Sequence, residues 1–357
     1  MRRPAILIAG LAFCLLGLAP APPRAPVDLA RLMDEDPAPT LEAYHLFDDS
    51  AVRRPNAGLT PYGLNTPLFS DYAAKQRYLY LPPGLQVKFV NRGPLDFPVG
   101  AVLVKTFAYP ADFRRPAENL RWIETRLLIH RASGWAALTY VWNDGQTRAV
   151  LKRAGLRVPV EFVDPAGGVR HIDYAVPNVN QCKECHAQSG AISPLGPKAR
   201  NLNGDYSYDG GRPENQVTHW TRLGLLSGAP AVASLGRTGR WDDPAAPLHL
   251  RARAYLDANC GHCHNREGLA SNSGLYLTWE EADHSAFGFR KRPVAAGRGS
   301  GDGLFDIEPG HPEASILVYR MGSTEPGVAM PQIGRSMIDK EGLTLIRAYI
   351  KAMPPLP

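Results

Sequence analysis

The residues Cys260-Gly261-His262-Cys263-His264 form a C-x-x-C-H motif, and Cys182-Lys183-Glu184-Cys185-His186 repeat it earlier in the chain. Two cysteines three positions apart, followed directly by a histidine, are the attachment pattern of a c-type haem. On a helical turn, positions i, i+3 and i+4 lie on one face. Both thiols can then form thioethers with the haem vinyl groups while the histidine reaches the iron. The sequence therefore predicts two covalently attached haem c groups.

The cysteine count supports this interpretation. One of the five cysteines, Cys14, lies in an apolar N-terminal run, and the other four all belong to the two motifs, so none remains for a structural disulfide. A zinc site built from the two C-x-x-C pairs is the alternative, with a redox disulfide as another. However, 74 residues separate the pairs, and neither alternative explains the histidine that follows each pair.

The second motif has a clear set of expected iron ligands. Cys260 and Cys263 would form the thioethers, and His264 would be the proximal ligand. Met330 lies in a Pro-flanked loop 66 positions after His264, and a methionine thioether is a soft, neutral ligand suited to electron-transfer haem iron. Met321 is the reserve candidate, in an apolar stretch where packing is its ordinary role. We expect Met330 to be the distal ligand.

The first motif has no such partner in the sequence. Cys182, Cys185 and His186 would attach and ligate its haem, but no methionine occurs between Met33 and Met321. Either a histidine binds the iron from the distal side, or a distant residue arrives from another domain, or the site is open. The histidines that we consider are His219, His130 and His171. His262, inside the second motif, is expected to point away from the iron.

The N-terminus has the pattern of a secretory signal peptide. Three residues, Met1-Arg2-Arg3, precede an apolar run over residues 6–18, and Ala19-Pro20-Ala21 is an A-x-A cleavage site. The run is short for a membrane span, and no other segment approaches its apolar length. We therefore expect residues 1–21 to be a signal peptide, no transmembrane segment in the mature chain, and a periplasmic location, since bacteria attach haem c outside the cytoplasm.

The remaining chain divides into four parts by its composition and its pattern of apolar residues. Residues 22–60 form a Pro/Ala-rich lead-in, 61–176 a β-rich domain, 177–245 a first haem segment and 246–357 a domain with the second haem. Short apolar or alternating runs predict the strands, at 86–90, 101–107, 122–129, 135–142, 158–163 and 170–176. Such spacing favours an antiparallel β-sandwich.

Helices are expected mainly after residue 177. Their predicted ranges are 213–226, a segment running into Cys260, and a C-terminal segment around 343–353. A helix leading into C-x-x-C-H and a helix closing the chain are the layout of a small cytochrome c. The fold class that we predict is therefore α+β and multidomain, with an N-terminal β-sandwich-like domain followed by a mainly α, cytochrome c-like haem-binding region.

Further motifs carry a resemblance. G-H-P-E-A-S at 310–315 and M-P-Q-I-G at 330–334 are similar to the C-terminal part of many bacterial cytochrome c domains. The chain also resembles a family of uncharacterised secreted dihaem c-type cytochromes. The segments that carry this second resemblance are E-T-R-L-L at 124–128, Y-V-W-N at 140–143, N-Q-C at 180–182 and G-P-K at 196–198. The resemblance implies a periplasmic dihaem protein without an established substrate.

The functional expectation is an electron carrier. The net charge of +6 is modest and gives no indication of nucleic-acid binding. A carrier would pass single electrons between periplasmic redox proteins and would need no catalytic residues of its own. One alternative is a peroxidase-like dihaem enzyme whose first haem is open. Another is the cytochrome subunit of a periplasmic dehydrogenase, which would make the dehydrogenase its partner.

Overall fold

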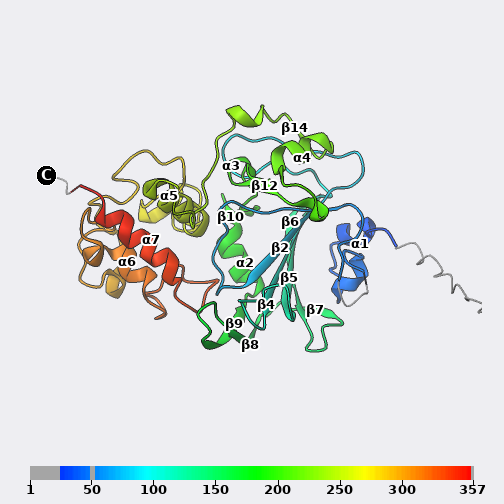
Figure 1. Ribbon diagram of the computed structural model, residues 1–357, viewed down its shortest axis with the longest axis horizontal. Helices are drawn as coiled ribbons and strands as arrows, with labels where there is room; N and C mark the ends of the chain where they lie inside the picture. The colour runs from blue at the N-terminus through cyan, green and yellow to red at the C-terminus, as the bar shows by residue number, and fades with distance from the viewer. Residues whose placement is uncertain (1–24, 49–52, 355–357) are drawn as a thin grey trace, which may run out of the picture.

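The computed structural model describes residues 25–48 and 53–354, and its centre is one six-stranded antiparallel sheet (Figure 1). The strand order across the sheet is β1-β2-β4-β5-β6-β7. In that order the strands span Leu59–Pro61, Ala74–Tyr80, Val102–Pro110, Leu120–Arg131, Gly134–Trp142 and Ala149–Leu151. The predicted signal peptide lies outside the described residues.

The two faces of the sheet differ because side chains alternate along each strand. One face is mostly apolar. Val104 and Leu127 are buried there against the N-terminal segment, which holds the helix α1 (Leu29–Met33) and the 3-10 turn η1 (Leu41–Tyr44). This segment covers the face and closes a first hydrophobic core.

The opposite face is apolar only at its two ends. At one end, Leu103 packs with Trp220 of α4 (Gln216–Arg222). At the other end, Phe107 packs against a hairpin of two later strands. Between these clusters the same face carries charged side chains, Lys105 on β4 and its register partner Arg126 on β5. This charged middle part of the sheet is turned toward the two motifs, as the cavities described below show.

The predicted β-sandwich is wrong, because the late strands do not build a second sheet that covers the first. β8 (Leu156–Val163) and β9 (Val169–Val176) pair only with each other, as a hairpin against one end of the central sheet. The run predicted at 86–90 becomes the short β3 (Val87–Lys88), which pairs in parallel with β14 (Leu226–Ser227). The predicted runs omitted β2, the second strand of the sheet.

The prediction of a mainly α region after residue 177 is also wrong. The described chain holds seven α-helices, and the six that lie after residue 177 are short and separated by long turns and loops. They span α2 Val179–His186, α3 Ala199–Leu202, α4 Gln216–Arg222, α5 Leu248–Asn259, α6 Ile316–Met321 and α7 Lys340–Lys351. Glycine, proline and asparagine interrupt helical patterns throughout this region, so the apolar periodicity extends over only a few turns at a time.

The individual helices were predicted more accurately than the fold class. α5 confirms the helix that runs into Cys260, and α7 confirms the C-terminal helix. The helix predicted over 213–226 is shorter, since Glu214–Asn215 form the strand β13 and only α4 is helical. The remaining strands are two-residue pairs, β10 (Ala187–Gln188) with β11 (Ala191–Ile192), and β12 (Asp205–Tyr206) with β13.

Residues 177–245 connect the sheet to the C-terminal helices. In Figure 1, α5, α6 and α7 lie at one end of the molecule and α1 at the other, with the sheet between them. α2 packs on β6, and α5 packs on α7. Asp71, just before β2, accepts from the backbone N–H groups of Ser336 and Met337 at 2.8 Å, which ties the sheet to the loop after Met330. Within residues 25–48 and 53–354, no helix is long and apolar enough to cross a membrane.

Candidate functional site

The first C-x-x-C-H motif forms the end of α2. Asn178 caps this helix, since its side-chain oxygen accepts from the Gln181 N–H at 2.9 Å and the Gln181 side chain accepts from the Asn178 N–H at 3.0 Å. This capping box satisfies two backbone donors that the helix leaves free. The helical geometry then places Cys182, Cys185 and His186 on one face.

The second motif follows α5 without an intervening loop. The N–H groups of Cys263 and His264 donate to the carbonyl of Cys260 at 3.1 and 2.9 Å, which folds the motif into one tight turn. Gly261 is required by a close approach, because a Cβ there would lie 2.9 Å from the carbonyl oxygen of Asp257. The turn keeps both thiols and the imidazole together, as covalent attachment to one ring requires.

Both motif histidines are held in the form that binds a metal. Nδ1 of His186 lies 2.8 Å from the carbonyl oxygen of Ser193, and Nδ1 of His264 lies 3.2 Å from that of Leu275. A carbonyl only accepts, so Nδ1 carries the hydrogen and Nε2 keeps its lone pair. Burial lowers the pKa of each histidine to about 4, which keeps both rings neutral at neutral pH. Such orientation of a ligating imidazole by a carbonyl is typical of metal sites.

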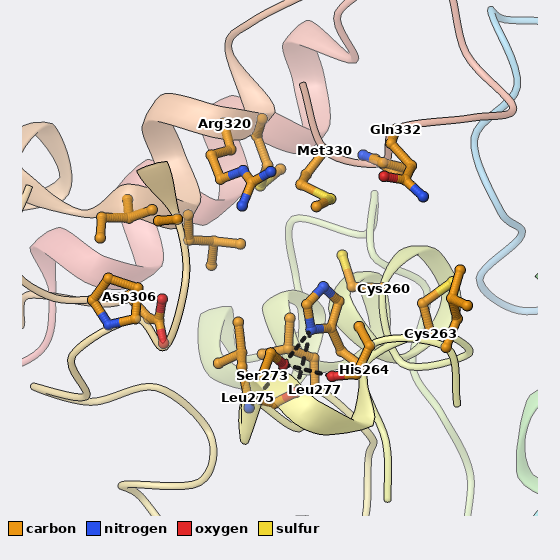
Figure 2. A pocket seen from close by; sticks show the side chains of 18 of the residues that line it. Cys260, Cys263, His264, Ser273, Leu275, Leu277, Asp306, Arg320, Met330 and Gln332 are labelled. Carbon is orange, nitrogen blue, oxygen red and sulfur yellow. Dashed lines mark hydrogen bonds between the residues drawn. The ribbon is translucent and has the colours of Figure 1, made fainter. Parts of the chain in front are cut away.

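The second motif opens onto a cavity of about 300 Å³. Cys260, Cys263 and His264 line one side, and Met330 lines the other. Figure 2 shows the His264 ring and the Met330 side chain on opposite sides of the same open space, with the Nδ1 edge of the ring bonded away from it. Two thiols, a neutral imidazole and a facing thioether are the donors that a haem c with His/Met ligation uses.

Met330 and Met321 both line this cavity, in different surroundings. Met321 ends α6 and is buried in the C-terminal core. Met330 lies in the loop after α6. Its backbone N–H donates to the carbonyl of Arg320 at 3.0 Å, and its carbonyl accepts from Arg335 at 2.8 Å. Because Met330 is not part of the apolar core, its side chain is free to face the motif.

The first motif lines a neighbouring cavity of about 140 Å³. Cys182, Cys185 and His186 form one part of its wall, and Lys105 and Arg126 of the central sheet form another. Cys185 also lines the cavity of the second motif. The two cavities therefore share a wall, although the motifs are far apart in the sequence, and residues that line both include Cys185, His262, Met321 and Met330.

The motifs touch each other directly. A hydrogen bond with Cys263 raises the pKa of the Cys185 thiol, and the same bond lowers the pKa of the Cys263 thiol. The Gln188 side chain adds a bond from Nε2 to the carbonyl of His262 at 3.1 Å. One cysteine of each motif thus lies at the boundary between the two sites. Sequence reasoning missed this contact, since it depends on how the 74 intervening residues fold.

His262 occupies a more central place than the sequence indicated. It lines both cavities and also a third one, of about 380 Å³, that His186 shares. Its Nδ1 is buried and has no hydrogen-bond partner in the described part of the chain. The His262 side chain also forms a hydrogen bond with the Cys185 thiol, which links the two motifs a second time.

The histidines considered as distal ligands of the first haem lie elsewhere. His219 on α4 pairs with Glu214 at 2.6 Å, and His130 at the end of β5 bonds to a backbone carbonyl at 2.8 Å. His171 is exposed on β9. None of the three lines any of the three cavities described here, so the structure does not bring them to His186.

The four cysteines do not form a zinc-like cluster. Over residues 25–48 and 53–354, no three side chains of the Cys, His, Asp and Glu types converge to hold a metal ion, and the four motif cysteines are free thiols. Comparisons with protein families, with curated proteins and with solved structures found no match to this chain. The candidate site therefore depends on its own geometry for interpretation.

Proposed function

We propose that the chain is a periplasmic protein with two covalently attached c-type haems that carries single electrons between a periplasmic donor and acceptor. One observation carries this proposal: each C-x-x-C-H motif presents two thiols and a neutral imidazole with a bare Nε2 to a cavity. Haem would supply the one-electron chemistry that side chains lack. The signal-like N-terminus supports the location.

The residues divide into attachment and ligation. Cys182 and Cys185 serve as thioether donors for the first haem, with His186 as its proximal ligand. Cys260 and Cys263 do the same for the second haem. His264 and Met330 would hold its iron, since they line opposite sides of one cavity. Because methionine favours ferrous iron, this pair makes the second site the high-potential one.

The contact between the motifs gives a reason for two sites in one chain. Cys185 and Cys263 lie at the shared boundary, so the attachment edges of the two sites are adjacent. Electrons would pass within the chain before reaching a partner protein, either a free periplasmic redox protein or a dehydrogenase that uses this chain as its cytochrome subunit.

A second candidate function is a peroxidase-like enzyme with an open first site. The observation behind it is that neither His219 nor His130 lines the cavity at His186, although Met321 and Met330 line it. In this case a small oxidant would reach the iron at the first motif. The two candidates differ in what the first site does with peroxide, which makes them separable by kinetics.

Rapid mixing of the holoprotein with small redox mediators tests the carrier. We expect both haems to be oxidised and reduced quickly, and peroxide turnover to be negligible. The matched control is a C182S/C185S variant, which lacks the first attachment site. A peroxide rate near ordinary enzyme values, about 10 per second, that disappears in this variant would contradict the carrier and establish the enzyme.

A further inference from the structure

A row of positive side chains crosses the charged face of the central sheet. Arg77 of β2 is the register partner of Lys105 of β4, which is the partner of Arg126 of β5. Directly opposite residues on antiparallel strands have Cβ atoms about 4.5–5.5 Å apart, and like charges there are destabilising. Lys75, two residues before Arg77, adds a fourth positive charge on the same face. We call Arg77, Lys105 and Arg126 the cationic row.

The protein supplies little negative charge to this row. Glu124 is fully buried. Its carboxylate accepts hydrogen bonds from Arg126 Nε at 3.0 Å and from the Tyr174 hydroxyl at 2.6 Å. Within the described chain, Arg77 and Lys105 form no ion pair at all. Glu124 therefore acts on Lys105 and Arg126, whereas Asp71 and Asp339 act on Lys75.

Lys105 shows the consequence of this imbalance. Its ammonium group lies 4.6 Å from the centroid of the Phe107 ring, and its side chain is only partly exposed. Burial, followed by the charges of Arg77, Lys75 and Arg126, holds the pKa of Lys105 well below its usual value. Arrays of cations that are short of counter-charge are costly in a protein interior unless an anion joins them.

The cationic row faces the space beside the first motif. Its three members line the 380 Å³ cavity together with His186, and Lys105 and Arg126 also line the cavity of Cys182. Thr139 of β6 continues the row as the register partner of Arg126, and it bonds to the Cys182 thiol. From Thr139 to Arg77 the row crosses three strand spacings, about 14 Å in all.

We propose that Arg77 and Lys105 bind the propionate carboxylates of the haem attached at Cys182 and Cys185. This inference rests on the proposed function. The propionates lie on the side of the haem ring opposite the vinyl groups. The row begins beside Thr139, which bonds to Cys182, and ends at Arg77, which forms no ion pair in the described chain. The planar guanidinium fork of arginine matches a carboxylate. Two carboxylates would offset the excess positive charge.

The test compares the full holoprotein with three variants. R77Q and K105M each remove one positive charge from the row. R121Q is the matched control, because Arg121 is also on β5 but is directed to Asp144 at 3.0 Å and lines none of the three cavities. Mass spectrometry first verifies two haems in the wild type. Loss of a haem there would reject the proposed function itself rather than this inference.

With two haems present, we expect R77Q and K105M to shift the propionate bending bands in resonance Raman spectra. We also expect each to lower the midpoint potential of one haem only, since less positive charge nearby favours ferric iron. R121Q should leave both midpoints unchanged. If R77Q does not retain the first haem, R77K replaces it in the test. R77K keeps the positive charge but lacks the planar guanidinium group, and it should still shift the propionate bending bands.

Unchanged bands and midpoints in both R77Q and K105M would overturn the inference. A small anion from solution is the competing occupant of the row. It would be revealed if sulfate or nitrate, titrated into the wild type, perturbed the haem spectrum and lost this effect in R77Q while the propionate bands stayed constant. That result would also overturn the inference.

Discussion

Met330 and Met321 line the same cavity, and only their surroundings separate their roles. Met330 comes from a loop, whereas Met321 packs in the core around α5, α6 and α7. Replacing Met330 with His should lower the midpoint of the second haem, because methionine raises the potential relative to histidine. The same variant should lose the weak near-infrared band expected of Met–Fe(III). Redox titration and near-infrared absorption measure the two effects.

M321L is the control for M330H. A leucine conserves the volume of the buried methionine, and such exchanges usually cost less than about 1.5 kcal/mol. We expect M321L to keep both the band and the two midpoints. A loss of the band in M321L together with unchanged spectra in M330H would reverse the assignment of the distal ligand.

At the residue scale, the sequence predicted what depends on local spacing. The motif cysteines, His186, His264 and Met330 all line cavities, and their roles as haem attachment and iron ligands stay predictions. The place of His262 on the walls of all three cavities was not predictable, because it depends on how the two motifs pack against each other. The cationic row was equally invisible, since its members are 21 to 49 positions apart and meet only through strand register.

At the scale of elements, one buried ion cluster joins the segment after the first motif to α5, which leads into the second motif. Asp257 on α5 accepts from Lys198 at 2.9 Å and from Arg200 at 3.1 Å, and all three side chains are largely buried. Removing one partner of such a cluster leaves uncompensated charge in the interior. We expect D257N to lower the free energy of unfolding by about 3 kcal/mol, measured by denaturant titration.

The same cluster has a predictable pH dependence. Burial alone raises the pKa of Asp257, but the charges of Lys198 and Arg200 outweigh burial and leave this pKa below its usual value. A carboxyl group with a depressed folded-state pKa stabilises above its unfolded pKa, about 3.9, and loses this contribution as the pH falls through the folded value. The stability difference between wild type and D257N should therefore be full at neutral pH and shrink below about pH 4.

The exposed pair of Arg240 and Asp242 provides the matched control. Both side chains are largely accessible to solvent, and D242N should change the free energy of unfolding by no more than about 0.5 kcal/mol. A D257N variant that is as stable as D242N would show that the buried cluster does not hold the two segments together.

The predicted elements were correct where an apolar pattern is strong. The alternation in β4, β5 and β6 marked these strands, and the helical periodicity marked α5 and α7. β2 was missed because Lys75 and Arg77 occupy inward-facing positions that normally hold apolar residues in a strand. A strand whose inward-facing positions hold charged residues lacks the apolar alternation by which strands are recognised in a sequence.

At the scale of the whole molecule, the arrangement of segments could not be read from the sequence. The boundary predicted at 176/177 coincides with the end of β9, but the following segment packs back onto the sheet through α2 and β14. The strand runs could equally have built two facing sheets. Instead the hairpin of β8 and β9 covers one end of the charged face, which leaves its middle open beside the first motif.

The presence of two covalent haems at adjacent sites is the central claim, and the intact mass of the mature chain after acid-acetone extraction tests it most directly. The wild type should carry two haem additions. C182S/C185S and C260S/C263S should each retain one, because each variant keeps one intact motif. An unmodified chain would contradict the account, as would bound zinc or a mass two hydrogens short, which would indicate a disulfide between Cys185 and Cys263.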